Sequence, residues 1–448
     1  MMIAAPCSGA GKTTVTCGLL GTLKNTGKHP CSFKCGPDYI DPMYHRRVLG
    51  IPSGNLDTFF TDQQTTSRLF TESYVGDVAV LEGVMGLYDG VGGIGERGSC
   101  YDLAHTLHCP ILLVVDAHGA ARSVLAQIKG FLDYDRYGCI KAVILNKIKP
   151  EFGRVLGELV EKELKIPCLG TLPRTDLLSL PERHLGLFLP EEIRDMQTRQ
   201  EKLAQLFAEH ISVSACLQIA ESAKALEVGE EDACVMSPSG KGLRLAVARD
   251  EAFCFYYREN LSLLKKAGLD LVEFSPLRDD KLPAQIHGLL LGGGYPEQHL
   301  EDLSQNRAMR EDIRKAIEDG MPVLAECGGF LYLLDAIEDQ KGQAFPMVGA
   351  ISGRAFWNKK LTRFGYVTIL GKDGTKIRGH EFHYYDTDHN GEDFMAEKPV
   401  GEKRWKCMFT INGGAVGFPH LYYPSNPAFV TKFAEAMQDY EKQRTFHR

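Results

Sequence analysis

The feature that most constrains the fold is a glycine-rich loop, Ser8–Thr14, which follows the short apolar run Met2–Ala5. The residues after the loop are compatible with a helix. A strand, a glycine-rich turn and a helix in this order form a phosphate-binding loop, because the backbone amides of the turn and the helix dipole both attract an anion. Gly9 and Gly11 can expose such amides, and Lys12 adds a mobile positive charge. We therefore predict a nucleotide-binding unit of the P-loop type.

The loop departs from the regular motif because Pro6 stands where the first glycine belongs. In a loop of this spacing, the hydroxyl of Thr13 can reach Mg²⁺. The predicted contacts to ATP in this loop are Gly9, Gly11, Lys12, Thr13 and Thr14.

Acidic residues that could serve the metal lie where apolar runs end. Glu82 follows the run Val78–Leu81, with Asp89 just beyond it, and Asp38 and Asp41 lie in a loop rich in Gly and Pro. In parallel sheets, ligands bind at the carboxyl ends of the strands, so these carboxylates are expected to face the phosphates. The alternative for Asp38 and Asp41 is that they cap turns, as aspartate often does.

The first half of the chain alternates apolar runs with polar helical segments, which predicts a doubly wound parallel sheet. Nearly continuous apolar runs are typical of strands that are covered on both faces. We expect strands at Met2–Ala5, Val78–Leu81, Pro110–Asp116, Ile140–Asn146 and Pro167–Leu172.

The second half is predicted to form another α/β unit. A charged stretch, rich in Glu and Gln, precedes it and indicates one or two amphipathic helices and a linker. The new apolar runs are Leu243–Ala248, Gly288–Leu291 and Pro322–Ala325. The expected organisation is an ATP-binding domain at 1–190, a helical segment with a linker at 191–241, and a second α/β domain at 242–448.

A lone cysteine, Cys327, lies between the last of these runs and a helix-compatible stretch, and two glycines follow it. Such a turn is a nucleophile elbow. It places the thiol at a helix N-terminus, which is expected to lower its pKa and favour the thiolate. Gly293 and Gly294 close an earlier strand, and their amides can donate to a tetrahedral oxyanion. The pattern predicts a glutaminase site.

The nucleophile needs a base, and three histidines compete for that role. His420 lies in a C-terminal segment, Gly417–Tyr422, whereas His380 and His383 share the segment Gly379–Tyr384. A single histidine is more often structural than catalytic, so the residues alone leave the choice open.

Composition narrows the class of protein. The 448 residues are 44% hydrophobic and 24% charged, which is typical of a soluble globular enzyme. A net charge of −7 disfavours a nucleic-acid partner, and no run approaches the roughly 18 apolar residues of a membrane span. Thirteen scattered cysteines fit a reducing compartment, and Met1–Ala5 lacks a basic leader. We expect a cytoplasmic protein with neither a nucleic-acid nor a membrane partner, and a homodimer is compatible with the sequence.

Motifs in both halves resemble one known family over nearly the whole chain. In the first half they are Ser8–Thr14, Gly36–Pro42, Asn55–Asp57, Glu82–Gly90 and Arg183–Leu187. In the second half they are Ala248–Phe253, Gly292–Glu297, Ala325–Gly329 and Gly379–His383. Together they resemble the cobyrinate a,c-diamide synthases, which are ATP-dependent glutamine amidotransferases of cobalamin biosynthesis. The resemblance implies a dethiobiotin-synthetase-like ATP domain joined to a class I glutamine amidotransferase domain.

The resemblance also implies roles for single residues. Cys327 becomes the nucleophile and His420 its base, while Lys12 and Thr13 contact the phosphates and Mg²⁺. Glu82 becomes the preferred carboxylate ligand of the metal, and Asp38 is a second candidate ligand. Asp38, Asp41 and Asp89 become candidates for organising ATP, the metal and the carboxylate of the tetrapyrrole. The family commonly reads His-Leu-His near the C-terminus, whereas this chain has Tyr422 two residues after His420, so no third member of a triad is assigned.

The implied substrates are cobyrinate and L-glutamine, with amidation of the acetates on rings A and C. Residues Tyr39 and Met43–Arg47 follow the acidic loop and either touch the macrocycle or form an ordinary helix start; we favour contact. The nearest alternative is a nickel sirohydrochlorin a,c-diamide synthase, whose motifs are too similar for the sequence to exclude it. Cobyric acid synthases are typically longer and have Ser-x-Ala-Gly-Lys-Ser in the loop. A partner-binding P-loop ATPase does not need Cys327 or the glycines Gly292–Gly294.

Overall fold

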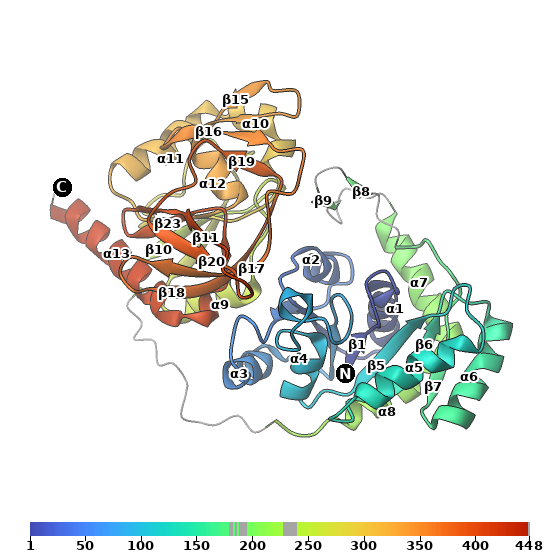
Figure 1. The fold of residues 1–448 in the computed structure, drawn as a ribbon. Helices are drawn as coiled ribbons and strands as arrows, with labels where there is room; N and C mark the ends of the chain where they lie inside the picture. The colour runs from blue at the N-terminus through green and yellow to red at the C-terminus, as the bar shows by residue number, and fades with distance from the viewer. Residues whose placement is uncertain (179–181, 184–185, 188–194, 227–239, 447–448) are drawn as a thin grey trace. The chain divides into compact units, whose positions relative to one another are not determined.

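The computed structural model describes residues 1–178, 182–183, 186–187, 195–226 and 240–446. The chain divides into two compact units, Met1–Gly229 and Glu230–Arg448 (Figure 1). Within the described residues, no helix combines the length and the apolarity that a bilayer span requires.

The first unit is built on a seven-stranded parallel sheet with the strand order β3-β2-β4-β1-β5-β6-β7. The strands are β1 (Met2–Ala4), β2 (Pro30–Cys35), β3 (Ser53–Leu56), β4 (Val78–Glu82), β5 (Ile111–Asp116), β6 (Ile140–Asn146) and β7 (Cys168–Thr171). The five strands predicted from apolar runs are confirmed to within one residue at each end, and β6 matches its prediction at both ends. Strands β1 to β4 are buried along their whole length, as expected for strands covered on both faces.

Eight helices of the described chain belong to this unit, most of them following a strand (Figure 1). They are α1 (Lys12–Asn25), α2 (Ile40–Arg47), α3 (Gln63–Ser73), α4 (Cys100–Thr106), α5 (Ser123–Tyr134), α6 (Pro150–Leu164), α7 (Met196–His210) and α8 (Val213–Glu221). A short antiparallel pair, β8 (Glu182–Arg183) and β9 (Gly186–Leu187), precedes α7.

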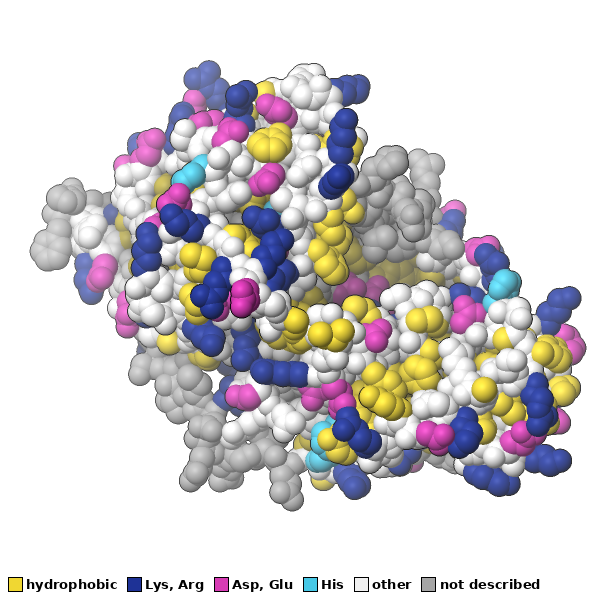
Figure 2. Space-filling model, in the orientation of Figure 1, with side chains coloured by type: hydrophobic (Ala, Val, Ile, Leu, Met, Phe, Trp, Pro, Cys, Tyr) yellow, Lys and Arg dark blue, Asp and Glu magenta, His cyan; other side chains and the backbone are white. Residues whose placement is uncertain are grey.

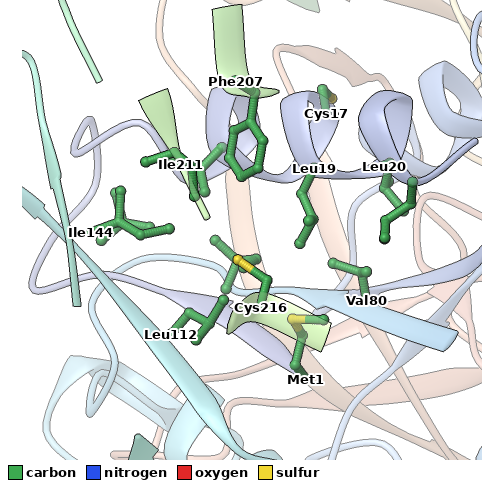
Figure 3. Packing of buried hydrophobic residues seen from close by; sticks show 14 of the residues in the cluster. Met1, Cys17, Leu19, Leu20, Val80, Leu112, Ile144, Phe207, Ile211 and Cys216 are labelled. Carbon is green, nitrogen blue, oxygen red and sulfur yellow. The ribbon is translucent and has the colours of Figure 1, made fainter. Parts of the chain in front are cut away.

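Helix α7 lies directly against α1, because two glycines of α1 let the helices approach closely. A methyl group on Gly18 would lie 2.8 Å from the ring of Phe207, and one on Gly21 would lie 2.6 Å from the amide of Gln200. Figure 3 shows Phe207 and Ile211 directed into the same apolar cluster as Leu19 of α1. The helical part of the predicted segment 191–241 is thus grouped with the first unit, and the predicted linker falls largely in 227–239, outside the described residues.

The second unit has a six-stranded sheet of order β11-β10-β12-β13-β23-β22, parallel except for the edge strand β22. Its strands are β10 (Arg244–Ala248), β11 (Asp270–Phe274), β12 (Gly288–Leu291), β13 (Val323–Glu326), β22 (Phe409–Ile411) and β23 (Gly414–Gly417). Its helices are α9 (Arg258–Lys266), α10 (Leu300–Gln305), α11 (Arg307–Glu318), α12 (Gly328–Leu333) and α13 (Pro427–Phe446). The three predicted strands of this unit are confirmed, β12 with both ends as predicted.

Two smaller sheets were not predicted from the sequence. One has the order β15-β14-β16-β19, with β14 (Leu334–Glu338), β15 (Ala344–Pro346), β16 (Ile351–Trp357) and β19 (Tyr385–Thr387). The other is antiparallel, with the order β21-β20-β17-β18-β24. Its strands are β17 (Arg363–Gly371), β18 (Lys376–His383), β20 (Phe394–Glu397), β21 (Arg404–Cys407) and β24 (His420–Leu421). This second sheet carries all three histidines that compete for the role of base.

Charged side chains of both signs are interspersed over the face seen in Figure 2. This mixed surface agrees with the modest net charge of −7.

Candidate active sites

The glycine-rich loop joins β1 to α1 in the conformation that a phosphate-binding loop needs. Gly9 and Gly11 have φ angles of 77° and 97°, in the left-handed region, and Gly11 caps the N-terminus of α1. The Lys12 ammonium donates to the carbonyl of Cys7 at 3.1 Å and to that of Met85 at 2.5 Å. Burial lowers the pKa of Lys12. A lysine that is held by two carbonyls can exchange these neutral partners for phosphate oxygens.

Thr13 and Glu82 meet at the base of this loop. The Thr13 hydroxyl donates to Glu82 Oε1 at 2.6 Å, and the Glu82 side chain is fully buried at the carboxyl end of β4. Among the described residues, Glu82 Oε2 makes no hydrogen bond; His45 Nε2 lies 3.5 Å from it. Burial raises the pKa of Glu82 to about 8. A cation bound beside Glu82 would favour its ionised form over the protonated acid.

A lysine that sequence reasoning did not single out occupies the centre of this acidic cluster. Lys34 Nζ lies 2.6 Å from Asp41 Oδ2 and 3.0 Å from Glu82 Oε1. Although burial opposes the charged form, Asp41 and Glu82 hold the pKa of Lys34 well above its usual range. Its position near the carboxyl end of β2, beside the strand that ends in Glu82, could have identified Lys34 as a site residue.

Asp38 and Asp41 differ in their contacts. Asp38 Oδ1 accepts from the amides of Ile40 and Asp41, which is the turn-capping geometry considered as the alternative, while its Oδ2 lies 3.9 Å from Lys34. Burial, with the neighbouring Asp41, raises the pKa of Asp38 to about 6. Burial raises the pKa of Asp41, but the nearby Lys34 ammonium lowers it by more. The pKa of Asp41 is therefore lowered overall.

The segment after this loop is helix α2, and several of its residues point into the protein. His45 is fully buried, with Nδ1 3.0 Å from Ser32 Oγ, and Tyr44 donates to Gln200 at 2.9 Å. Met43 is buried as well. For these three residues our preference for macrocycle contact is therefore wrong, because they pack inside the first unit; Arg47 is exposed.

Asp89 lies in the loop after β4, and its side chain contacts that same loop. Its side chain is exposed and accepts from the amide of Gly86 at 2.9 Å, which braces the loop that carries Met85. Through Met85 the loop contacts Lys12.

A cavity of about 280 Å³ adjoins the glycine-rich loop. It is lined by Gly11, Thr14, Asp116, His118, Asn146, Lys147, Arg174, Thr175 and Asp176. Lys147 ties this wall to the loop, since its ammonium lies 2.7 Å from both Gly9 O and Asp116 Oδ2. A larger cavity, about 530 Å³, lies at the opposite edge of the sheet around Met1 and Val78, where ligands of parallel sheets are not bound.

The residues at this edge fit Mg²⁺ together with a nucleotide. Mg²⁺ generally takes one or two carboxylates and completes its shell with phosphates and water. Thr13 and Glu82 supply a hydroxyl and a buried carboxylate 2.6 Å apart. Within the described part of the chain, no group of three or more His, Cys, Asp or Glu side chains is arranged around one metal position.

Cys327 lies between β13 and α12 in a strained conformation, with φ 48° and ψ −104°. Its amide donates to Gly417 O at 2.8 Å, which joins it to β23. The expectation of a lowered thiol pKa is wrong for this structure. Burial and the carboxylates of Glu297 and Glu381 raise the pKa of Cys327 well above its ordinary value, and one amide, that of Gly328, opposes them.

The predicted oxyanion glycines lie beside this turn. A methyl group on Gly328 would lie 3.1 Å from the amide nitrogen of Gly294, so that amide is close to the start of α12. Gly293 is covered by the ring of His420, whose Cε1 would lie 2.4 Å from a methyl group there. The structure thus brings Gly293, Gly294, Cys327 and His420 into one neighbourhood.

The other two histidines have different surroundings. His383 Nε2 lies 3.0 Å from Glu381 Oε2, and its Nδ1 lies 2.6 Å from Tyr385 O. His380 Nδ1 lies 3.0 Å from the hydroxyl of Tyr257, and its ring stacks on His420 with centroids 4.8 Å apart.

His420 is buried, and burial lowers its pKa to about 3, so its imidazole is neutral near pH 7. Its Nδ1 lies 3.8 Å from Glu326 Oε2. Glu326 Oε1 accepts from the hydroxyl of Tyr423 at 3.1 Å, and the amide of Leu421 also donates to this carboxylate. Burial raises the pKa of Glu326 to about 8.

Comparison with known protein families agrees with the two-unit structure. Residues 1–188 match the CobQ/CobB/MinD/ParA nucleotide binding domain, and residues 244–415 match the CobB/CobQ-like glutamine amidotransferase domain. Cys327 lies inside the second match, whereas His420 follows it. A nucleotide-binding domain joined to a glutamine amidotransferase domain defines the class of this protein.

Relatives along the full chain define the family. The chain is 39% identical to the cobyrinate a,c-diamide synthase of Caldanaerobacter subterraneus subsp. tengcongensis, over 99% of both chains. It is 37% identical to that of Listeria innocua, covering 96% of this chain and 97% of the relative, and 36% identical to that of Salmonella typhimurium, covering 97% of both. The chain belongs to the cobyrinate a,c-diamide synthase family.

Proposed function

We propose that this protein amidates the a and c acetate side chains of cobyrinate, using ATP and glutamine. One observation carries the proposal: a nucleotide loop whose Thr13 contacts the buried Glu82, and a cysteine elbow with its histidine, occur in a single chain of this family. Cobyrinate a,c-diamide synthase is the name of the relatives described above, and the substrate is taken from that name. ATP and glutamine are both cytoplasmic metabolites, which supports a cytoplasmic location.

The ATP site of the first unit activates the substrate carboxylate. ATP transfers its γ-phosphoryl group to a substrate carboxylate oxygen, which yields an acyl phosphate and ADP. Lys12, Gly9, Gly11 and the N-terminus of α1 hold the phosphates, and the cavity lined by Thr14 and Asn146 receives the nucleoside. When bound, Mg²⁺ supplies charge neutralisation for the phosphoryl transfer, and Thr13 and Glu82 would hold it.

The cluster around Lys34 has a structural role at the ATP site. Asp38, Asp41 and Glu82 converge on this ammonium, and their carboxylates repel one another in a buried site. Lys34 keeps them together, so that Glu82 stays aligned with Thr13. We assign Arg47, which is exposed at the C-terminal end of α2, to the reading of the macrocycle edge, while Asp89 braces the Met85 loop.

The glutaminase site of the second unit releases ammonia from glutamine. His420 takes the proton of Cys327, and the sulfur attacks the side-chain amide carbon. The C–N bond breaks, and the nitrogen leaves as ammonia with the proton returned by His420. The amides of Gly293 and Gly294 stabilise the oxyanion. Water then hydrolyses the thioester to glutamate, and ammonia displaces phosphate from the acyl phosphate to give the amide.

The experiment offers cobyrinate and nickel sirohydrochlorin separately, at equal concentration, with ATP and glutamine. We expect cobyrinate to gain two amides, with one ATP consumed for each, as measured by mass spectrometry and ADP release. A clear preference in kcat/KM for the nickel compound would refute the assigned substrate.

The variant Cys327→Ala distinguishes the glutaminase reaction from ATP-dependent synthesis. Cys327→Ala should abolish glutamine-dependent amidation and retain synthesis with high concentrations of an ammonium salt, because external ammonia bypasses the glutaminase. If the folded variant binds ATP but fails with ammonia, the division of labour is wrong.

A further inference from the structure

A histidine that serves as general base needs a partner at its second ring nitrogen. That partner fixes which nitrogen carries the proton, so that the other is free to accept one, and it stabilises the imidazolium that forms. Two residues after His420 the chain has Tyr422, which is buried and packs edge-to-face on Tyr257, with ring centroids 5.2 Å apart. Position 422 therefore carries an aromatic residue where the family commonly has histidine, and it supplies no carboxylate.

We infer that Glu326, the residue before the nucleophile, is the positioning residue of His420. Its carboxylate oxygen Oε2 lies 3.8 Å from His420 Nδ1, and both side chains are buried. In this arrangement the N–H group at Nδ1 of His420 donates a hydrogen bond to Glu326. The other ring nitrogen, Nε2, carries no proton and can receive the proton of Cys327. The inference rests on the proposed glutaminase step and names a residue that the step requires.

Glu326 is held in place by the same segment that carries His420. The amide of Leu421 and the hydroxyl of Tyr423 both donate to its carboxylate, from the residues on the C-terminal side of His420. The pairing of β13 with β23 places Glu326 opposite Gly417, three residues before His420. The carboxylate and the imidazole are thereby fixed to each other through short stretches of backbone.

The separation of 3.8 Å is longer than a hydrogen bond. Catalytic hydrogen bonds are often long before substrate binds and shorten in the complex. Burial raises the pKa of Glu326, and the two donors it has from Leu421 and Tyr423 are neutral. The imidazolium that forms at His420 supplies a nearby cation, so the attraction between the two groups increases when the thiol gives up its proton.

Another buried acid of this neighbourhood, Glu381, serves a different histidine. Glu381 accepts from Trp405 at 3.3 Å and lies 3.0 Å from His383, whose other nitrogen contacts a backbone carbonyl. Glu381 and Glu326 are thus comparable in burial, and each adjoins one histidine. Glu381 is the matched control for the experiment.

The experiment compares the full-length variants Glu326→Gln and Glu381→Gln. Thioester formation is followed by rapid quench with labelled glutamine, and ammonia-dependent synthesis reports whether the fold is intact. We expect Glu326→Gln to lower kcat of the glutaminase by about a hundredfold or more, the usual range for loss of base function. KM for glutamine and the ammonia-dependent rate should stay near those of the unaltered protein. The loss in Glu381→Gln should be clearly smaller.

Thioester formation in Glu326→Gln within about fivefold of the unaltered protein would overturn the inference, and so would an equal loss in both variants. A second measurement covers the case in which Glu326→Gln does not fold. The ¹⁵N chemical shifts of His420 in the unaltered protein should report a proton on Nδ1, and a neutral ring protonated at Nε2 would also overturn the inference. If the unaltered protein releases no ammonia from glutamine, the proposed function fails; if it does and Glu326→Gln is equally active, only the inference fails.

Discussion

The contact between Gly293 and His420 allows a sharp test of the glutaminase geometry. A methyl group on Gly293 would lie 2.4 Å from His420 Cε1 and 3.1 Å from its Nδ1. Favourable contacts between carbon atoms begin near 3.5 Å, so Gly293→Ala must displace the imidazole or the glycine loop by about 1 Å. A misplacement of about 1 Å in a catalytic group can cost about a hundredfold in rate. We therefore expect Gly293→Ala to reduce thioester formation by about that factor.

The control for this variant is Gly288→Ala in β12. An added methyl group there also meets a buried neighbour, at 3.0 Å, but this neighbour is the flexible side chain of Met437. Both variants should retain ammonia-dependent synthesis, since the first unit is unchanged. Rapid-quench measurement of the glutamyl thioester decides the question. If Gly293→Ala forms the thioester within about threefold of the unaltered rate, His420 is not the base that this geometry implies.

Three further outcomes follow from the same contacts. Glu82→Gln should lower both glutamine- and ammonia-dependent synthesis by orders of magnitude, because the buried carboxylate beside Thr13 is lost; near-normal turnover with ammonia would remove Glu82 from the ATP site. His420→Ala should match Cys327→Ala in glutaminase assays, whereas His383→Ala should keep more activity, and a reversed order would assign His383 as base. The raised pKa of Glu326, about 8 against an ordinary 4.5, stabilises the fold at low pH, and this contribution is lost as pH rises through 8. Melting temperatures between pH 5 and 8 should therefore fall less steeply in Glu326→Gln than in the unaltered protein, and parallel curves would contradict this.

The central strands of both units were predictable because they are nearly continuous apolar runs. The run at Ile140–Asn146 and the run at Gly288–Leu291 became β6 and β12 without a change of boundary. The antiparallel sheet from β17 to β24 was missed, since its strands β17 and β18 mix buried, half-buried and exposed residues and include polar ones such as Glu381 and His383. A strand that is half exposed gives a weaker apolar signal than a strand covered on both faces.

Site residues were predictable where local spacing determines geometry. Lys12 and Thr13 belong to a turn whose shape is set within a few residues, and Cys327 belongs to another. Lys34 was missed because its partners Asp41 and Glu82 come from different elements, and only the pairing of β2 with β4 brings Lys34 and Glu82 together. Its burial follows from tertiary structure, which local sequence does not reveal.

The raised pKa of the Cys327 thiol determines how the nucleophile can form. The helix that follows it, α12, has only six residues, and one amide hydrogen bond opposes burial and the nearby carboxylates. Because the pKa of the thiol is raised, the resting site holds a neutral thiol beside a neutral imidazole, with no preformed thiolate. The proton must therefore pass to His420 as the sulfur attacks. Reaction then depends on the position of that imidazole, which lies close to both Gly293 and Glu326.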